Sequence, residues 1–154
     1  MSISNAVRKA LVTSAFGLSL ALLPATGALA SPASPVSYDD SAYGFYLGSK
    51  GATDGTPWRS KDNATSTYIK VNSNWGKSPR LYVDGAKDSN GRNTTNCTNG
   101  GSVRAPGPGK YEIHNGVYEL GFRWARITSW ADLGPGGLSG AWSPDCQGNY
   151  TDLN

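Results

Sequence analysis

The sequence holds few side chains suited to acid–base or nucleophilic chemistry, and His114 is its only histidine. A Ser-His-Asp hydrolytic site would have to use this residue as its base. His114 follows a predicted strand and directly precedes Asn115, a plausible helix N-cap, with no nucleophile-elbow pattern nearby. We therefore expect His114 to be a surface residue in a turn region.

Two other groups of residues invite a catalytic interpretation. Glu112 and Glu119 are candidates for a glycosidase carboxylate pair, but nothing in the predicted strand and helical turn makes them converge. Ser143, Pro144 and Asp145 fit a turn that ends the last strand better than a nucleophile site, because Pro144 has no N–H for the sheet ladder. Asp145 can accept backbone N–H groups there, while the preceding Trp142 can fill the core. The sequence thus predicts no catalytic residue and no enzyme.

Cys97 and Cys146 are the only cysteines. Outside the cell an even number of cysteines suggests pairing, so we predict a Cys97–Cys146 disulfide. The chain-entropy model gives such a loop a stabilisation of roughly 4 kcal/mol. Two cysteines and one histidine make a poor metal set, and we expect neither a metal nor a cofactor.

The first 30 residues have the pattern of a signal peptide. Arg8 and Lys9 precede a mostly apolar stretch, Pro24 interrupts it, and Ala28-Leu29-Ala30 is an A-x-A cleavage pattern. A membrane anchor is the alternative, but the apolar run is shorter than the roughly 20 residues that span hydrocarbon. We predict a signal peptide at 1–30, a disordered Pro/Ser linker at 31–41 and one secreted, extracellular β-rich domain at 42–154.

Charge argues against a nucleic-acid partner. The whole chain has 14 basic and 11 acidic residues, and loss of Arg8 and Lys9 leaves 12 against 11. Arg80, Lys87 and Arg92 are scattered and form no basic cluster. No strongly cationic amphipathic segment is present either, so we expect no membrane insertion and a monomer in solution.

Short alternating segments separated by Gly, Asn and Pro turns predict an all-β fold. The expected strands are 43–48, 65–72, 80–84, 110–113, 123–128 and 138–142. One short helical turn is predicted at 115–122, with Asn115 as N-cap and Gly121 as C′ glycine. The pattern favours a small antiparallel β-sandwich or a partly open barrel. The polar segment 87–109 is long for a loop, and the disulfide is a candidate for its restraint.

Aromatic residues on the outward faces of the strands are the candidate ligand contacts. If Ile69, Val83 and Ile127 face the core, then Tyr68, Tyr82 and Trp124 face outward on the same strands. Exposed aromatics can stack on the apolar faces of sugar rings, and the neighbouring Arg126 can contact carboxylates or phosphates. Ordinary cross-strand aromatic pairing is the alternative interpretation.

Three segments together resemble a family of small secreted proteins of unknown function from Gram-positive bacteria. The matching positions are Thr67 and Tyr68, then Asn115, Val117, Glu119, Gly121, Ala125, Arg126 and Ile127, then Ser139, Gly140, Trp142, Ser143, Pro144 and Asp145, the last six forming S-G-x-W-S-P-D. The resemblance implies a compact extracellular β fold and no particular reaction. This chain departs from the family pattern after Asp145, where it adds Cys146 and an eight-residue tail.

These observations support two functional hypotheses. The first is a non-catalytic binding module for cell-surface glycan or another extracellular ligand, contacted by Tyr68, Tyr82, Trp124 and Arg126. The alternative is a bacteriocin-like antagonistic or signalling factor.

Overall fold

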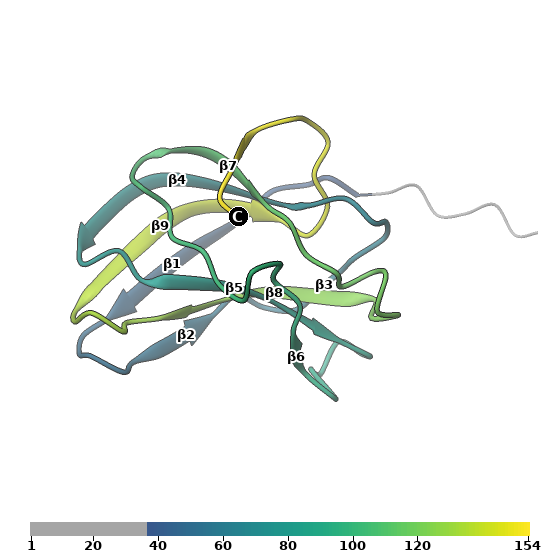
Figure 1. Ribbon diagram of the computed structural model, residues 1–154, viewed down its shortest axis with the longest axis horizontal. Helices are drawn as coiled ribbons and strands as arrows, with labels where there is room; N and C mark the ends of the chain where they lie inside the picture. The colour runs from purple at the N-terminus through teal and green to yellow at the C-terminus, as the bar shows by residue number, and fades with distance from the viewer. Residues whose placement is uncertain (1–36) are drawn as a thin grey trace, which may run out of the picture. The chain divides into compact units, whose positions relative to one another are not determined.

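The structure, a computed structural model, describes residues 37–154, and these residues form two stacked β-sheets (Figure 1). The predicted signal peptide at 1–30 and the first part of the predicted linker, 31–36, lie outside the described residues. Within the described range no helix is long and apolar enough to cross a membrane.

The first sheet, sheet A, has the strand order β1-β9-β4-β7-β10. Its strands are β1 (Ser41–Leu47), β9 (Gly136–Ser143), β4 (Thr67–Gly76), β7 (Gly109–Ile113) and β10 (Thr151–Asp152). All neighbours are antiparallel except β10, which pairs in parallel with β7. The chain therefore returns after β9 to lay its C-terminal residues along the edge of β7.

The second sheet, sheet B, has the order β2-β8-β5-β6, with β3 also paired to β8. Its strands are β2 (Thr53–Gly55), β8 (Trp124–Trp130), β5 (Arg80–Ala86), β6 (Thr95–Asn96) and β3 (Arg59–Ser60). The two sheets are not closed into a barrel. The sequence left sandwich and partly open barrel as alternatives, and the structure is a sandwich.

The core lies between the sheets and follows the predicted alternation of the strands. Its largest fully buried side chains include Trp142, Phe45, Leu47, Ile69, Leu81, Ile113, Ile127 and Leu138. Trp142 from β9 pairs in register with Ile69 of β4, so the last long strand contributes the bulkiest core residue. The alternating pattern places aliphatic residues inward on both sheets, as the period of two requires.

Residues 115–122 form a tight turn and no helix. Asn115 accepts a hydrogen bond from the N–H of Val117 through its side chain, and Gly121 has a φ of 78°. The two capping residues thus act as their types predict. Between them, however, only one backbone hydrogen bond has the four-residue spacing of an α-helix, from the Leu120 N–H to the Gly116 carbonyl. The next two bonds along the chain have other spacings and close the turn. The expected helical turn is therefore one hydrogen-bonded turn and not a helix.

Backbone hydrogen bonds hold the long polar segment 87–109. Val103 exchanges two such bonds with Leu81, and the Cys97 N–H donates to the Val83 carbonyl. The short strand β6 pairs with β5 at the same edge of sheet B. Pairing to β5 thus restrains segment 87–109, for which the sequence suggested a disulfide.

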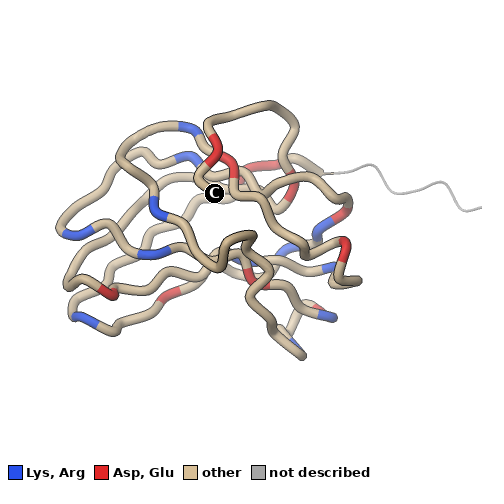
Figure 2. Tube along the Cα trace, in the orientation of Figure 1, with Lys and Arg blue, Asp and Glu red and all other residues tan. Residues whose placement is uncertain are grey.

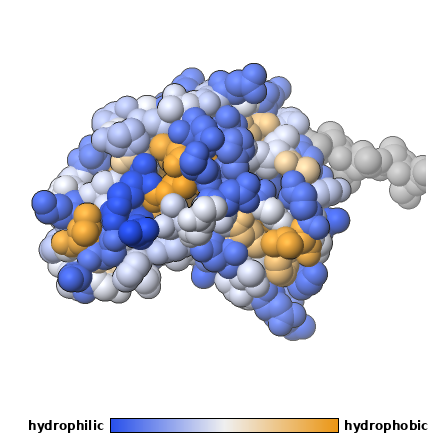
Figure 3. Space-filling view, in the orientation of Figure 1, coloured by the Kyte–Doolittle hydropathy of each residue, from blue (hydrophilic) through white to orange (hydrophobic). Residues whose placement is uncertain are grey.

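Charges of both signs are interspersed along the described chain (Figure 2). On the face seen in Figure 3, hydrophobic residues form small separate patches among hydrophilic ones. Figure 2 shows no basic stripe along the described residues.

Candidate functional site: two hollows on the outer face of sheet A

The structure divides the four predicted ligand residues between the two sheets. Tyr68 lies on β4 of sheet A, whereas Tyr82 lies on β5 and Trp124 and Arg126 lie on β8, all in sheet B. Tyr68 is also buried, because Tyr150 from the C-terminal segment packs on it with ring centroids 4.7 Å apart. The single aromatic patch predicted from the sequence is therefore wrong: alternation gives the face of a strand but not the sheet to which the strand belongs.

On sheet B, the side chain of Arg126 is already engaged. Its guanidinium stacks on Trp58 at 4.7 Å, and its Nε lies 3.3 Å from the Asp84 carboxylate. Tyr82 and Trp124 are half-buried on the same face. This arrangement is the cross-strand packing of a half-covered sheet.

The outer face of sheet A carries a hollow of about 390 Å³, here called the tyrosine hollow. It is lined by Tyr38, Asp39, Asp40, Tyr68, Lys110, Ser143, Asp145, Gln147 and Tyr150. Three tyrosine rings and several polar side chains therefore converge on one concave site, the arrangement typical of small-ligand sites.

The two ends of the described chain build the walls of the tyrosine hollow. Asn63 donates to the Tyr38 hydroxyl at 3.4 Å, and Arg59 donates to the Asp39 carbonyl at 2.6 Å. On the other side, parallel pairing of β10 with β7 brings Tyr150 over Tyr68. The sequence analysis assigned Tyr38, Asp39 and Asp40 to the linker and Tyr150 to a tail, since two-residue pairing leaves no periodicity to detect.

One side chain that lines the tyrosine hollow lacks a partner. Ser143 is 1% exposed, and its Oγ has no hydrogen bond to any of the described residues. A buried hydroxyl left unpaired costs free energy, so such a group calls for a partner. Burial also raises the pKa of Tyr68, which keeps its phenol neutral and able to donate.

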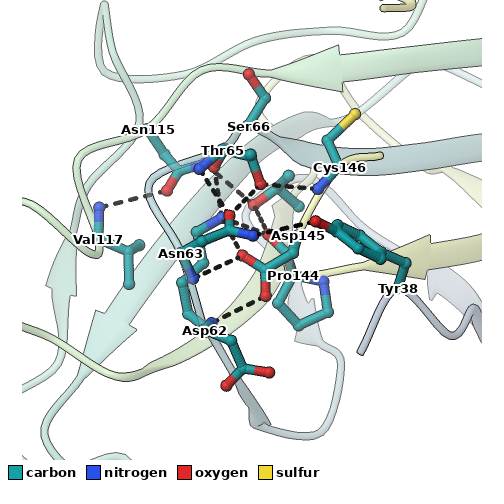
Figure 4. A network of polar contacts seen from close by, with 12 residues as sticks. Tyr38, Asp62, Asn63, Thr65, Ser66, Asn115, Val117, Pro144, Asp145 and Cys146 are labelled. Carbon is teal, nitrogen blue, oxygen red and sulfur yellow. Dashed lines mark hydrogen bonds and ion pairs between the residues drawn. The ribbon is translucent and has the colours of Figure 1, made fainter. Parts of the chain in front are cut away.

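The S-P-D motif lies just beneath this hollow and is a structural centre. Asp145 pairs with Lys61 at 3.0 Å with both side chains fully buried, and it accepts the N–H groups of Asp62 and Asn63 (Figure 4). Lys61 Nζ also donates to the carbonyl of Pro144 at 2.7 Å. Burial lowers the pKa of Lys61, and the Asp145 carboxylate opposes that shift. The motif thus ties the end of β9 to the segment before β4.

A second hollow of about 470 Å³, here called the histidine hollow, lies next to the first and shares Gln147 with it. Ser66 Oγ is 2.7 Å from His114 Nδ1, and His114 Nε2 is 3.1 Å from Asp152 Oδ2. Sequence analysis expected a surface histidine, and the ring is indeed 45% exposed. The sequence did not predict that Ser66 and Asp152 contact His114, because these residues lie at the ends of other strands, far from His114 in the chain.

The two cysteines are free thiols, and the predicted disulfide is absent from the structure. Cys97 packs in the core, where a Cβ on Gly85 would lie 2.9 Å from its Sγ. Cys146 lies instead beside Glu112 on the outer face of sheet A, with Sγ 3.8 Å from Oε2. The two side chains have separate surroundings, which the sequence could not reveal.

Within residues 37–154, no group of three or more His, Cys, Asp or Glu side chains is arranged to hold a metal ion. Glu112 lines the histidine hollow, whereas Glu119 lies in the exposed turn after β7 and is not part of either hollow.

Comparison with known proteins gives a family but no activity. No curated protein and no solved structure matches the chain. A family model described as protein of unknown function (DUF2712) matches residues 29–146, which is most of the chain and includes Ser66, His114 and the S-P-D motif. The chain therefore belongs to this uncharacterised family, DUF2712.

Proposed function

We propose that the protein is an extracellular binding module that takes a saccharide of the cell surface into the tyrosine hollow. The convergence of three tyrosine rings and several polar side chains on one hollow carries this proposal.

The chemistry of the hollow suits a polyhydroxylated ring. Aromatic rings stack on the apolar C–H face of a sugar, and Tyr38 is partly exposed for this purpose. The carboxylates of Asp39 and Asp40 can accept hydrogen bonds from ring hydroxyls, while Lys110 can donate. With two exposed aspartates against one lysine, the hollow favours a neutral or cationic sugar over an anionic polymer.

The test is cosedimentation of the full chain with isolated Gram-positive cell walls. Tyr38→Ala and Tyr150→Ala are expected to lower the fraction bound at least about tenfold, because each removes a stacking surface worth roughly 1.4 kcal/mol or more.

Tyr46→Ala is the matched control. Tyr46 is 76% exposed on β1, in register with Gly137 at the far end of β9 from Ser143. Binding that resists the hollow variants but is lost in Tyr82→Ala or Trp124→Ala would move the site to sheet B and refute the proposal. No binding of the unmodified chain to walls would refute it as well.

A further inference from the structure

Ser66 and His114 in the histidine hollow, with Asp152 beside His114, stand in the order that nucleophilic catalysis requires. Ser66 Oγ contacts one ring nitrogen of His114, and the Asp152 carboxylate contacts the other. A nucleophile bonded to a base, with the base oriented by a third group, is the general signature of an activated hydroxyl. We propose that Ser66, His114 and Asp152 form a hydrolytic site for short-chain acyl esters.

The two contacts together set the protonation of the imidazole. A carboxylate accepts but does not donate, so His114 Nε2 carries the hydrogen and donates it to Asp152. Nδ1 is then the free acceptor, and the Ser66 hydroxyl donates to it at 2.7 Å. The neutral ring is thereby held in the tautomer that can remove a proton from Ser66. Asp152 is a positioning residue, because it acts only through His114.

Strand pairing fixes these groups relative to one another. Ser66 immediately precedes β4 and His114 immediately follows β7, and the adjoining residues Thr67 and Ile113 are direct partners in that pair. Asp152 lies on β10 in register with Glu112 of the same β7 strand. Asn154 adds two bonds to the backbone of His114, which hold the end of the chain in place. A site built on strand ends keeps its geometry better than one built on loops.

Donors for the developing oxyanion are available in the same hollow. Gln147, Gly148 and Asn149 line it, and their backbone N–H groups donate no hydrogen bond to residues 37–154. In Figure 4 the side chains of Ser66 and Cys146 point to the same side, away from the Asp145 network and thus free of it. Backbone N–H groups free to donate to the substrate are the usual means of stabilising a tetrahedral intermediate.

The lining of the hollow defines the substrate class. It is lined by Ala64, Thr65, Ser66, Glu112, His114, Cys146, Gln147, Gly148 and Asn149, with no large apolar side chain. A long acyl chain would find no apolar slot there, whereas an acetyl group on a hydroxylated alcohol fits. Glu112 and Asp152 together disfavour an anionic substrate.

The reaction consumes one ester and one water. Ser66 Oγ attacks the ester carbonyl carbon while its proton moves to His114 Nδ1. The ester C–O bond breaks, the alcohol leaves with that proton, and an acyl-Ser66 remains. Water then attacks the acyl carbon and gives its proton to Nδ1. The bond to Oγ breaks, the proton returns to Ser66, and the carboxylic acid leaves.

The test uses the full chain with 4-nitrophenyl acetate and, separately, a fluorophosphonate probe mapped by peptide mass spectrometry. We expect turnover and a label on Ser66. Ser66→Ala and His114→Gln are expected to lose the label and at least about 100-fold in turnover, the usual contribution of a general base. Ser73→Ala is the matched control, because Ser73 is an exposed serine of β4, the strand that Ser66 precedes, and its hydroxyl bonds to that of Ser139. No turnover, or a label that persists in Ser66→Ala, would overturn the proposal.

A separate pair of variants tests the role of Asp152 as a positioning residue. Asp152→Asn keeps the strand residue but removes its charge, so kcat should fall while KM stays the same. Asn154→Ala loosens the same chain end by removing side-chain bonds to the backbones of His114 and Asn99, but it removes no side chain of the relay. An equal fall of kcat in both variants would mean that Asp152 only anchors the end of the chain. That result would overturn its assignment as a positioning residue. Because the tyrosine hollow is not used by these substrates, failure here leaves the binding proposal standing, and the reverse also holds.

Discussion

At the scale of single residues, Asp145 joins the end of β9 to the segment before β4. Its carboxylate pairs with the fully buried Lys61 and accepts two backbone N–H groups. Buried pairs are costly to form but far more costly to break, since the remaining charge has no partner. The chain thus depends on Asp145 even though the pair itself adds little net free energy.

We predict that Asp145→Asn lowers the free energy of unfolding by about 3–5 kcal/mol, the cost of stranding a buried ammonium group. Urea denaturation followed by tryptophan fluorescence measures this change. Arg92→Ala is the matched control: it breaks an ion pair with Asp88 in which the arginine side chain is 77% exposed, and it should cost less than about 1 kcal/mol. Similar losses of unfolding free energy in the two variants would contradict the structural role assigned to the buried Lys61–Asp145 pair.

Residue types predicted several local interactions but not the partners that are distant in sequence. Asn115 and Gly121 act as capping residues of their turn, which local chemistry alone dictates. The same reasoning placed His114 at the surface and yet missed its neighbours. Ser66 and Asp152 meet it only because β4 and β10 flank β7, and sheet order is not encoded in any short window of sequence.

At the scale of elements, the close approach of β9 to β4 depends on Gly140. A Cβ at this position would lie 1.9 Å from the carbonyl oxygen of Lys70, next to the register shift between Val71 and Ser73. Backbone atoms at that distance cannot move aside without opening the strand pair. The glycine of the S-G-x-W-S-P-D motif is therefore required by packing.

We predict that Gly140→Ala lowers the free energy of unfolding by at least about 1–3 kcal/mol, the usual cost of overpacking, and slows no chemical step. Thermal unfolding followed by circular dichroism measures it. Gly107→Ala is the control, because a Cβ there meets nothing within 4 Å and its φ is not positive. A Gly140→Ala protein as stable as the control would mean that β9 and β4 are more loosely paired than the structure has them.

The six long strands could be predicted because each shows apolar and polar residues in alternation over four or more residues. The short strands β2, β3, β6 and β10 could not, because two or three residues carry no period. This difference explains why the fold class followed from the sequence while the candidate site did not. The tyrosine hollow is lined partly by residues just before β1, and both hollows are lined by residues between β9 and β10, segments that carry no strand pattern.

At the scale of the whole molecule, two sheets around one core leave the cysteines in separate places. Cys97 belongs to the core cluster, and Cys146 lies on the outer face of sheet A. Burial raises the pKa of both thiols, which keeps them protonated near neutral pH and poor as nucleophiles. A disulfide needs Cα atoms within about 7 Å of each other, and the structure forms none between these two cysteines.

We predict that the purified full chain contains two free thiols that react quickly only when the sandwich unfolds. Alkylation in denaturant without reductant, followed by intact mass spectrometry, should show two added groups. Under native conditions the same reagent should act slowly, and Cys146 should react before Cys97 because its sulfur borders the histidine hollow rather than the core. Denatured protein that takes up no label until it is reduced would show a disulfide and a rearranged C-terminal segment. Since that segment carries Tyr150 and Asp152, such a result would also change both proposed sites.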